Sequence, residues 1–257
     1  MWLLGMKNTN GRKRICWENI FQNYNQEEKM QLKELNQKFK NQTWQENLTQ
    51  ILQYFENVTF STSFSLEDQI ITHFIEKNKL PIEVFTLDTG RLFKETYGIW
   101  QKTLDIYGIK IQAFYPDANQ IGEFVSQNGI DAFYNSKELR VSCCQIRKVE
   151  PLKRALKGKD LWISGLRSGH SASRDDKDLA ERDKGFDITK FYPLLHLSEG
   201  EVWDYLKKNN VPFNKLYDSG FTSIGCAPCT RAIEDGEDPR AGRWWWEDSK
   251  KECGLHG

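Results

Sequence analysis

Five of the six cysteines occur in patterns that could carry chemistry. Cys143 and Cys144 are adjacent, and Cys226 and Cys229 form a Cys-x-x-Cys pair much later in the chain. Four thiolates are soft ligands that suit zinc or an iron–sulfur cluster. Zinc usually takes its cysteines as spaced pairs, whereas a cubane separates its irons, so that adjacent cysteines can each bind a different one. The spacing favours a 4Fe–4S cluster over the alternatives, which are a zinc site, a redox dithiol on Cys226 and Cys229, and buried small hydrophobic residues.

Cys253, close to the end of the sequence, is a candidate nucleophile. Nearby cations favour a thiolate, and Lys250–Lys251 and His256 are its neighbours in sequence. We expect Arg240 and Arg243 to lie near it in space, with the C-terminal end folded over a pocket as a lid. The alternative is a surplus cysteine on a frayed terminus.

Basic residues near the cysteines predict an anion site. Arg240 and Arg243 are three residues apart, so one helical turn would put both on one side. Guanidinium groups suit phosphate or sulfate, although a solvated ion pair with the acidic residues 237–238 is the alternative. Lys148 follows Cys144 by one turn, where it could offset the charge of a cluster and reach an anionic substrate.

A Ser/Thr-rich loop is a second candidate for anion binding. The β-prone run 58–60 leads into STSFSLEDQ (61–69) and then a helical pattern over 70–75. Hydroxyls and free N–H groups at a helix N-terminus can bind a phosphate. The alternative is a plain N-cap, with Ser65 and Asp68 resembling a capping box. The loop lacks the glycines and lysine of a Walker motif, which argues against a P-loop ATPase.

Strand and helix patterns alternate along the rest of the chain. The predicted strands are 58–60, 82–87, 109–115, 160–164 and 188–192, and the predicted helices include 43–55, 97–107, 121–127, 139–156 (with Pro151 as a kink) and 198–207 (with Ser198 and Glu201 as a capping box). This alternation predicts an α/β fold with a mostly parallel sheet and helices on both faces. Asp-Thr-Gly (88–90) follows a predicted strand, where open sheets bind ligands, although the tripeptide is also a common turn.

We predict three parts: a polar N-terminal arm or peripheral helix (1–42), an α/β nucleotide-binding domain (43–224), and a cysteine-rich C-terminal segment of the same domain (225–257). The chain carries 36 basic and 36 acidic residues, so its net charge does not call for nucleic acid or an anionic membrane. No run approaches the roughly 20 apolar residues of a spanning helix, and the first residues lack the order of a secretory signal. We expect a cytoplasmic protein with reduced thiols, in which Cys16 is a buried small residue.

With these motifs in place, the sequence resembles the assimilatory adenylylsulfate (APS) reductase family of iron–sulfur type, which is related to phosphoadenylylsulfate (PAPS) reductase. The matching runs are LDTGRLFKETY (87–97), CCQIRKVEPLKRAL (143–156), ISGLR (163–167), SIGCAPCTRAIEDGEDPRAGRWWWE (223–247) and KECGLH (251–256). The resemblance implies the adenine nucleotide α-hydrolase-like fold. It also implies one 4Fe–4S cluster per chain, bound by Cys143, Cys144, Cys226 and Cys229.

The resemblance further implies a reaction. Cys253 attacks the sulfur of APS, AMP leaves, and thioredoxin or glutaredoxin releases sulfite from the S-sulfocysteine. The implied substrate-binding residues are Ser61, Ser63, Ser65, Leu87, Thr89, Lys148, Arg167, Arg240, Arg243 and His256. The loop after Arg167, SGHSASR, departs from the polar pair that is frequent in the family. The alternatives are a PAPS or dual-specificity reductase, an ATP-using RNA-modifying relative, and a zinc-stabilised binding module; the oligomeric state stays open, a homo-oligomer included.

Overall fold

A computed structural model describes residues 29–170 and 177–247 of the chain. The chain divides into two compact units, Met1–Asn41 and Gln42–Gly257. In the first unit, residues 29–39 form a helix. The predicted nucleophile Cys253, the predicted substrate-binding His256 and Cys16 lie outside the described residues.

The second unit contains a six-stranded sheet in the order β3-β2-β1-β4-β6-β5. Its strands are β1 (Val58–Ser61), β2 (Glu83–Leu87), β3 (Ile111–Phe114), β4 (Leu161–Ile163), β5 (Ala180–Asp183) and β6 (Ile188–Phe191). The neighbouring strands pair in parallel from β3 to β6, and β5 alone pairs antiparallel, with β6. The predicted mostly parallel sheet is confirmed.

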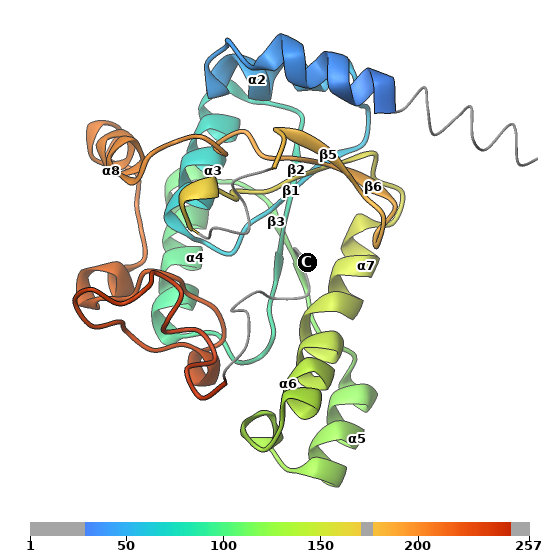
Figure 1. Ribbon diagram of the computed structural model, residues 1–257, viewed down its shortest axis with the longest axis vertical. Coiled ribbons are helices and arrows are strands. Elements are labelled where there is room, and N and C mark those ends of the chain that lie inside the picture. The colour runs from blue at the N-terminus through green and yellow to red at the C-terminus, as the bar shows by residue number, and fades with distance from the viewer. Residues whose placement is uncertain (1–28, 171–176, 248–257) are drawn as a thin grey trace, which may run out of the picture. The chain divides into compact units, whose positions relative to one another are not determined.

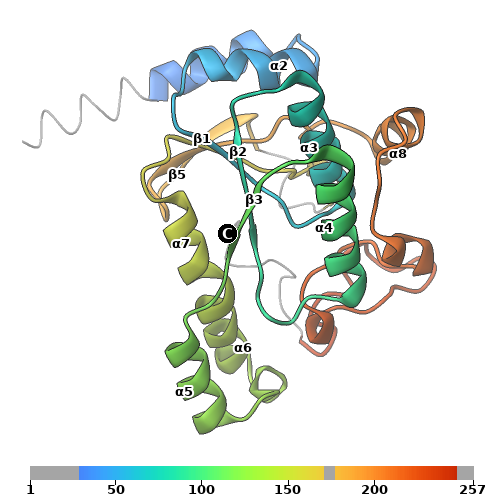
Figure 2. The same cartoon turned by 180° about the vertical axis from the view of Figure 1, so that it is seen from behind.

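Helices connect the strands and cover both faces of this sheet. They are α2 (Trp44–Gln50), α3 (Leu66–Asn78), α4 (Lys94–Tyr107), α5 (Ala118–Asn128), α6 (Lys137–Cys144), α7 (Glu150–Leu156) and α8 (Glu199–Lys208). Figures 1 and 2 agree that α3 and α4 lie on one side of the strands, and α6 and α7 on the other. Ser198 and Glu201 form the predicted capping box at the start of α8.

The apolar stripe of α7 explains why this helix lies on the sheet. Leu152, Ala155 and Leu156, at the i, i+3, i+4 spacing of one helical face, pack with Phe85 of β2 and Trp162 of β4. The sheet interior is fully buried, and Trp162 is 2 % exposed. This packing holds the carboxyl ends of β1, β2 and β4 in fixed relation to the helix that carries Lys148.

The helical stretch predicted over 139–156 is irregular in the middle rather than simply kinked at Pro151. A π-helical turn over Gln145–Val149 joins α6 to α7, and the Glu150 N–H donates to the Gln145 carbonyl. Proline has no N–H and crowds the carbonyl four residues earlier, here that of Arg147, so the wider turn just before it relieves the conflict. π turns are frequent at functional sites, and this one follows the two cysteines directly.

Strand β5 was not predicted from the sequence. Its residues, AERD, are mostly charged and do not alternate in hydrophobicity. It lies at the edge of the sheet, where one face and one edge meet solvent and charged residues are favoured. The short polar turn 184–187 between β5 and β6 was the available signal for a hairpin.

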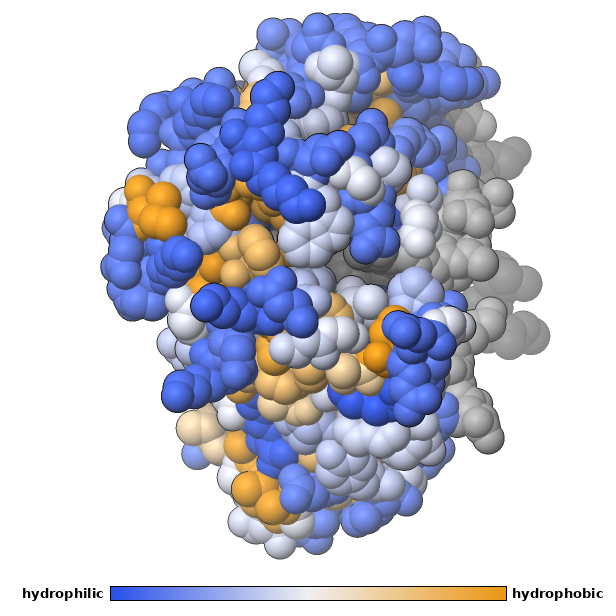
Figure 3. Space-filling view, turned by 90° about the vertical axis from the view of Figure 1, so that its left-hand side faces the viewer, coloured by the Kyte–Doolittle hydropathy of each residue, from blue (hydrophilic) through white to orange (hydrophobic). Residues whose placement is uncertain are grey.

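Within the described residues, no helix is both long and apolar enough to cross a lipid bilayer. The face in Figure 3 is mostly polar, with apolar side chains in patches between charged ones.

Candidate functional site

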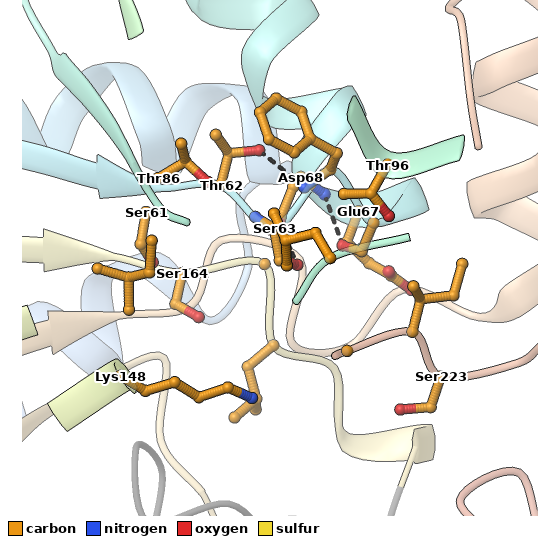
Figure 4. A pocket seen from close by; sticks show the side chains of 18 of the residues that line it. Ser61, Thr62, Ser63, Glu67, Asp68, Thr86, Thr96, Lys148, Ser164 and Ser223 are labelled. Carbon is orange, nitrogen blue, oxygen red and sulfur yellow. Dashed lines mark hydrogen bonds between the residues drawn. The ribbon is translucent and has the colours of Figure 1, made fainter. Parts of the chain in front are cut away.

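A cavity of about 230 Å³ opens at the carboxyl ends of β1, β2 and β4. This is where parallel sheets place ligand-binding loops. Most of the predicted substrate-binding residues line it, namely Ser61, Ser63, Ser65, Leu87, Thr89, Lys148, Arg240 and Arg243. Figure 4 shows Lys148 extending into the cavity from the side opposite Ser63.

The Ser/Thr-rich loop at the start of α3 is held mainly by Asp68. The Asp68 Oδ2 atom accepts 2.7 Å hydrogen bonds from both the backbone N–H and the hydroxyl of Ser63. Ser65 caps α3 by accepting from the Asp68 N–H. The Asp68 carboxylate does not complete the predicted capping box, because it turns to Ser63 rather than back to Ser65. Burial raises the pKa of Asp68 to about 6, although hydrogen bonds from Ser63 lower it in part.

Ser61 is oriented by a tryptophan in the next strand. The Trp162 indole N–H donates a 2.8 Å hydrogen bond to the Ser61 Oγ. A hydroxyl that accepts in this way keeps its own proton for another partner, such as a ligand acceptor. The ammonium of Lys190 lies 4.5 Å from the centre of the Trp162 ring and forms a buried ion pair with Asp183.

Two arginines converge at the other end of the cavity. Arg240 and Arg243 each donate to the Ser223 hydroxyl, at 3.5 and 3.3 Å. Both side chains are buried. Gly225 makes room for Arg243, because a Cβ there would lie 2.7 Å from the guanidinium carbon. The alternative, a solvated ion pair with Glu237 or Asp238, is not favoured, because Glu237 pairs with Arg231 and the Asp238 carboxylate accepts from the Arg240 backbone N–H.

Arg167 lies outside the cavity lining. It is 3 % exposed, and its Nε donates at 2.6 Å to Glu67, while another guanidinium nitrogen donates to the Leu197 carbonyl. Glu67 itself lines the cavity. Arg167 therefore neutralises a cavity carboxylate and links the loop after β4 to α3, and its predicted contact with substrate stays a prediction.

The four paired cysteines come together in a second, smaller cavity. Cys143 and Cys144 lie at the end of α6, whereas Cys226 precedes and Cys229 ends a short 3₁₀ turn. All four are free thiols. Burial raises the pKa of Cys143, and raises that of Cys229 to about 12, with Cys226 adding to the effect on Cys229. Undisturbed, these two thiols are protonated at neutral pH, so binding a metal would release protons.

The cysteine cavity has the chemistry of a site for an anionic group. Besides four soft sulfur donors, it is lined by the cations Arg91, Arg140, Arg147 and Lys148. The buried Arg147 Nε has no hydrogen-bond partner among the described residues. Thiolate ligands and compensating cations fit an iron–sulfur cluster. No described group of three or more His, Cys, Asp or Glu side chains has the arrangement for one metal ion.

The two cavities share a wall. Cys226 and Lys148 line both. Thr89, in the first cavity, lies 3.3 Å from the Cys226 Sγ through its hydroxyl, and its carbonyl accepts from Arg147 at 2.6 Å. The Asp-Thr-Gly segment is therefore a structural link between the cavities rather than only a turn.

Trp244 and Glu247 hold the chain beside the cysteines. Arg140 of α6 and Glu247 form a two-bond ion pair at 2.9 and 3.0 Å, with both side chains less than 10 % exposed. The guanidinium carbons of Arg140 and Arg243 each lie 4.8 Å from the centre of the Trp244 ring. Trp244, one of three consecutive tryptophans, thus packs in the core between two cations.

The cavity at the carboxyl ends of β1, β2 and β4 is also lined by residues that the sequence analysis did not predict. The Ser223 hydroxyl accepts hydrogen bonds from Arg240 and Arg243. Glu67, Asp68 and Ser164 add further polar groups to the lining. Asp68 was interpreted only as part of a cap, and its short spacing from Ser63 was the signal for a side chain that turns back into the loop. Ser223 carried no such signal, because its role depends on the path of the C-terminal segment.

Comparisons with known proteins agree with this geometry. Residues 57–232 match the model of the phosphoadenosine phosphosulfate reductase domain. The chain is 46 % identical over 212 residues to adenosine 5′-phosphosulfate reductase of Allochromatium vinosum, covering 82 % of this chain and 83 % of that protein. It is 47 % identical over 210 residues to the protein of the same name from Burkholderia cepacia, covering 81 % and 84 %.

Solved structures extend the likeness to the fold. Phosphoadenylyl-sulfate reductase from Candida auris, in a phosphate complex, superposes with a TM-score of 0.68 at 27 % identity, over 79 % of this chain and 96 % of that one. The FMN adenylyltransferase of Candida glabrata shares the fold alone, with a TM-score of 0.51 at 16 % identity over 81 % and 68 % of the two chains. Family model, relatives and fold coincide, and the chain belongs to the phosphoadenosine phosphosulfate reductase domain family.

Proposed function

We propose that this protein reduces APS to sulfite and AMP, with thioredoxin or glutaredoxin as the electron donor, in cytoplasmic sulfate assimilation and cysteine biosynthesis. Curated relatives that are 46–47 % identical carry the name adenosine 5′-phosphosulfate reductase. The observation that carries the proposal is the shared wall: a cavity lined by Lys148, Arg240 and Arg243 adjoins a cavity lined by four cysteines.

In this proposal the chain's own side chains bind and orient the substrate. Lys148, Arg240 and Arg243 bind the phosphosulfate, and the hydroxyls of Ser61 and Ser63 lie on the nucleoside side. Guanidinium groups gathered in a buried site stabilise the charge that develops on the leaving phosphate oxygen. The binding of a doubly anionic group also offsets the repulsion between neighbouring cations.

The covalent steps are assigned to Cys253. Its thiolate attacks the sulfur of the sulfo group, the bond from that sulfur to the bridging oxygen breaks, and AMP leaves with the electron pair. The donor thiolate then attacks the Cys253 Sγ, sulfite leaves with the electrons of the S–S bond, and the second donor thiol resolves the mixed disulfide. The donor is oxidised to a disulfide while the substrate sulfur is reduced by two electrons.

Cys143, Cys144, Cys226 and Cys229 are the proposed ligands of one 4Fe–4S cluster. When bound, the cluster contributes fixed charge and polarisable sulfur beside the anion site. Lys148 lines both cavities, and in this proposal it contacts both the substrate and the cluster. Its ammonium would couple the charge of the cluster to the binding of the substrate.

The decisive experiment measures sulfite release from APS and from PAPS, side by side, with thioredoxin present. We expect sulfite and AMP from APS, and no sulfite from either substrate after Cys253→Ser. Incubation with ³⁵S-labelled APS and no thioredoxin should leave label on the wild-type chain and none on the variant.

Cys16→Ser is the matched control, because it removes a thiol that has no part in the proposed chemistry; this variant should retain the wild-type rate. Full activity of Cys253→Ser would overturn the nucleophile assignment. A higher kcat/KM with PAPS would replace the proposed activity by the alternative, a PAPS or dual-specificity reductase.

A further inference from the structure

The Trp244 ring is contacted by one cation from each cavity. Arg140 lines the cysteine cavity and Arg243 lines the larger one, and each places its guanidinium carbon 4.8 Å from the centre of the ring. The Trp244 side chain is buried, with an exposed fraction of 1 %. A guanidinium that rests on an aromatic face is held without the use of its N–H groups, which stay available to a ligand. The place of Arg243 therefore depends on the place of this ring.

The backbone at Trp244 is held in an unfavourable conformation. Its φ of 42° is left-handed, which is costly for a residue with a large side chain. The Trp244 N–H donates to the Cys229 carbonyl at 3.1 Å, and the Trp244 carbonyl accepts from the Glu247 N–H at 2.9 Å. These two hydrogen bonds close a turn that begins beside a cysteine of the smaller cavity and ends at Glu247.

Arg140 holds the far end of this turn. Two of its guanidinium nitrogens donate to the two carboxylate oxygens of Glu247, at 2.9 and 3.0 Å. A bidentate pair fixes the orientation of both partners as well as their separation. One guanidinium of α6 thus holds both the ring of Trp244 and the side chain of Glu247.

The same pair keeps Glu247 from competing for Arg243. Glu247 follows Arg243 by four residues, and both of its carboxylate oxygens accept from Arg140. A buried carboxylate that lost its partner would attract a neighbouring cation. The hydrogen bond from Arg243 to the Ser223 hydroxyl is long, at 3.3 Å, and would resist such a movement only weakly.

We infer that Arg140 is a positioning residue for the anion site of the larger cavity, although it does not line that cavity. It holds Trp244 and Glu247, and these two residues keep the Arg243 guanidinium directed into the cavity. The inference rests on the proposed function in taking Arg243 as a group that binds the anionic end of a nucleotide. It assigns to a side chain of the cysteine cavity an effect on the affinity of the neighbouring cavity.

Equilibrium binding tests the inference without turnover. Titration calorimetry would compare ADP, which has two linked anionic groups as APS does but no sulfur to transfer, with adenosine, which has none. The ratio of the two affinities separates the anion site from the nucleoside contacts and from a general loss of structure. We expect wild-type protein to bind ADP at least about tenfold more tightly than adenosine, and Arg140→Met to reduce that ratio by about fivefold or more.

A double-mutant cycle shows whether Arg140 acts through Arg243. Arg243→Met removes the binding group itself and should reduce the ratio further than Arg140→Met does. The double variant Arg140→Met with Arg243→Met should have the ratio of Arg243→Met alone, because Arg140 then has nothing left to position. Arg140→Lys, which keeps a cation for Glu247 and Trp244, should recover part of the ratio.

Arg231→Met is the matched control. Arg231 forms a two-bond pair with Glu237, at 2.8 Å for each bond, in the same segment of the chain, and it lines neither cavity. Its ratio should equal that of the wild type. If Arg140→Met does not yield folded protein, Arg140→Met with Glu247→Leu removes both buried charges, and its ratio should still be lower than that of the wild type because Trp244 has lost its support.

An unchanged ratio in Arg140→Met, an equal decrease in Arg231→Met, independent effects of Arg140 and Arg243 in the cycle, or equal wild-type affinity for ADP and adenosine would each overturn the inference. Sulfite release from APS by the same wild-type preparation is scored separately. A preparation that releases sulfite but shows no effect of Arg140 on the ratio contradicts the inference alone. A preparation whose ratio depends on Arg140 but which releases no sulfite contradicts the proposed function alone.

Discussion

At the scale of single residues, the two cavities contain groups whose ionisation or backbone conformation is unfavourable outside the folded protein. No cation in the described part of the chain forms an ion pair with the Asp68 carboxylate, Phe64 has a left-handed backbone conformation with a φ of 61°, and Cys229 is a buried thiol with a raised pKa. Each is energetically unfavourable by itself and is maintained by the packing around it. Such residues gather where a protein binds or reacts rather than where it is most stable.

Asp68 yields a prediction on stability and pH. Its pKa rises from 3.8 in the unfolded reference to about 6 in the folded protein, so folding favours the protonated form. This contribution to stability is present below pH 3.8 and is lost as the pH rises through 6. Asp68→Asn should therefore raise the free energy of unfolding above pH 6, by at most about 3 kcal/mol, with the gain shrinking towards pH 4.

Urea unfolding of the ligand-free protein at several pH values between 4 and 8 measures this difference. Asp88→Asn serves as the reference, because the same change there removes a buried carboxylate that accepts from the Gly90 N–H and the Tyr97 hydroxyl. A gain for Asp68→Asn that did not depend on pH, or a loss at pH 8, would contradict the assigned ionisation.

At the scale of elements, the ends of strands and one irregular helix bring the site together. β1, β2 and β4 deliver Ser61, Leu87 and Ser164 to one edge of the sheet. The helix from α6 through the π turn to α7 carries two cysteines and Lys148 along the other cavity. Residues 209–247, after α8, have little regular structure and are held to α6 by the buried pair of Arg140 and Glu247.

Most of the strands and helices could be predicted from the sequence. Buried strands such as β2 and β4 are short apolar runs, and α7 repeats its apolar residues at helical spacing, so local patterns are sufficient. Edge strand β5 was missed because its charged residues reflect exposure rather than pairing. The cysteine pairs were predictable as one site from their chemistry, whereas the convergence of Arg240 and Arg243 on Ser223 depends on long-range packing.

The ion pair of Arg140 and Glu247 should be important for stability. Glu247→Ala leaves a buried guanidinium without its carboxylate and should lower the free energy of unfolding by about 3 kcal/mol or more. The double variant Arg140→Met with Glu247→Leu should recover part of that loss, because neither buried charge remains.

A double-mutant cycle of wild type, Arg140→Met, Glu247→Leu and the double variant, measured by chemical denaturation beside Glu247→Ala, gives the coupling energy of the pair. Arg182→Ala, which breaks an exposed pair with Asp187, is the control and should cost less than about 1 kcal/mol. Equal small losses for Glu247→Ala and Arg182→Ala would show that the buried pair is not important for stability.

At the scale of the whole molecule, the proposed cluster would join two distant parts of the chain. Two of its ligands lie at the end of α6 and two in the segment after α8. Protein purified without oxygen should be brown and contain about four iron and four acid-labile sulfide per chain. Cys143→Ser and Cys226→Ser should each lose iron and lower the Tm, because metal–thiolate bonds contribute to the stability of the fold they connect.

Cys16→Ser should keep the iron content and the Tm of the wild type. Metal analysis and thermal unfolding on the same samples distinguish the outcomes. Colourless protein with one zinc per chain would contradict the cluster and favour the zinc-stabilised alternative.

Cys226 and Lys148 each line two cavities, and this shared position limits which substitutions the protein can accept during evolution. A substitution at either position would disturb both neighbours at once, so we expect lineages to leave them unaltered while they adapt to new nucleotides. The start of α3 lines the larger cavity alone. Substitutions there would therefore change the nucleotide-binding cavity without disturbing the four cysteines.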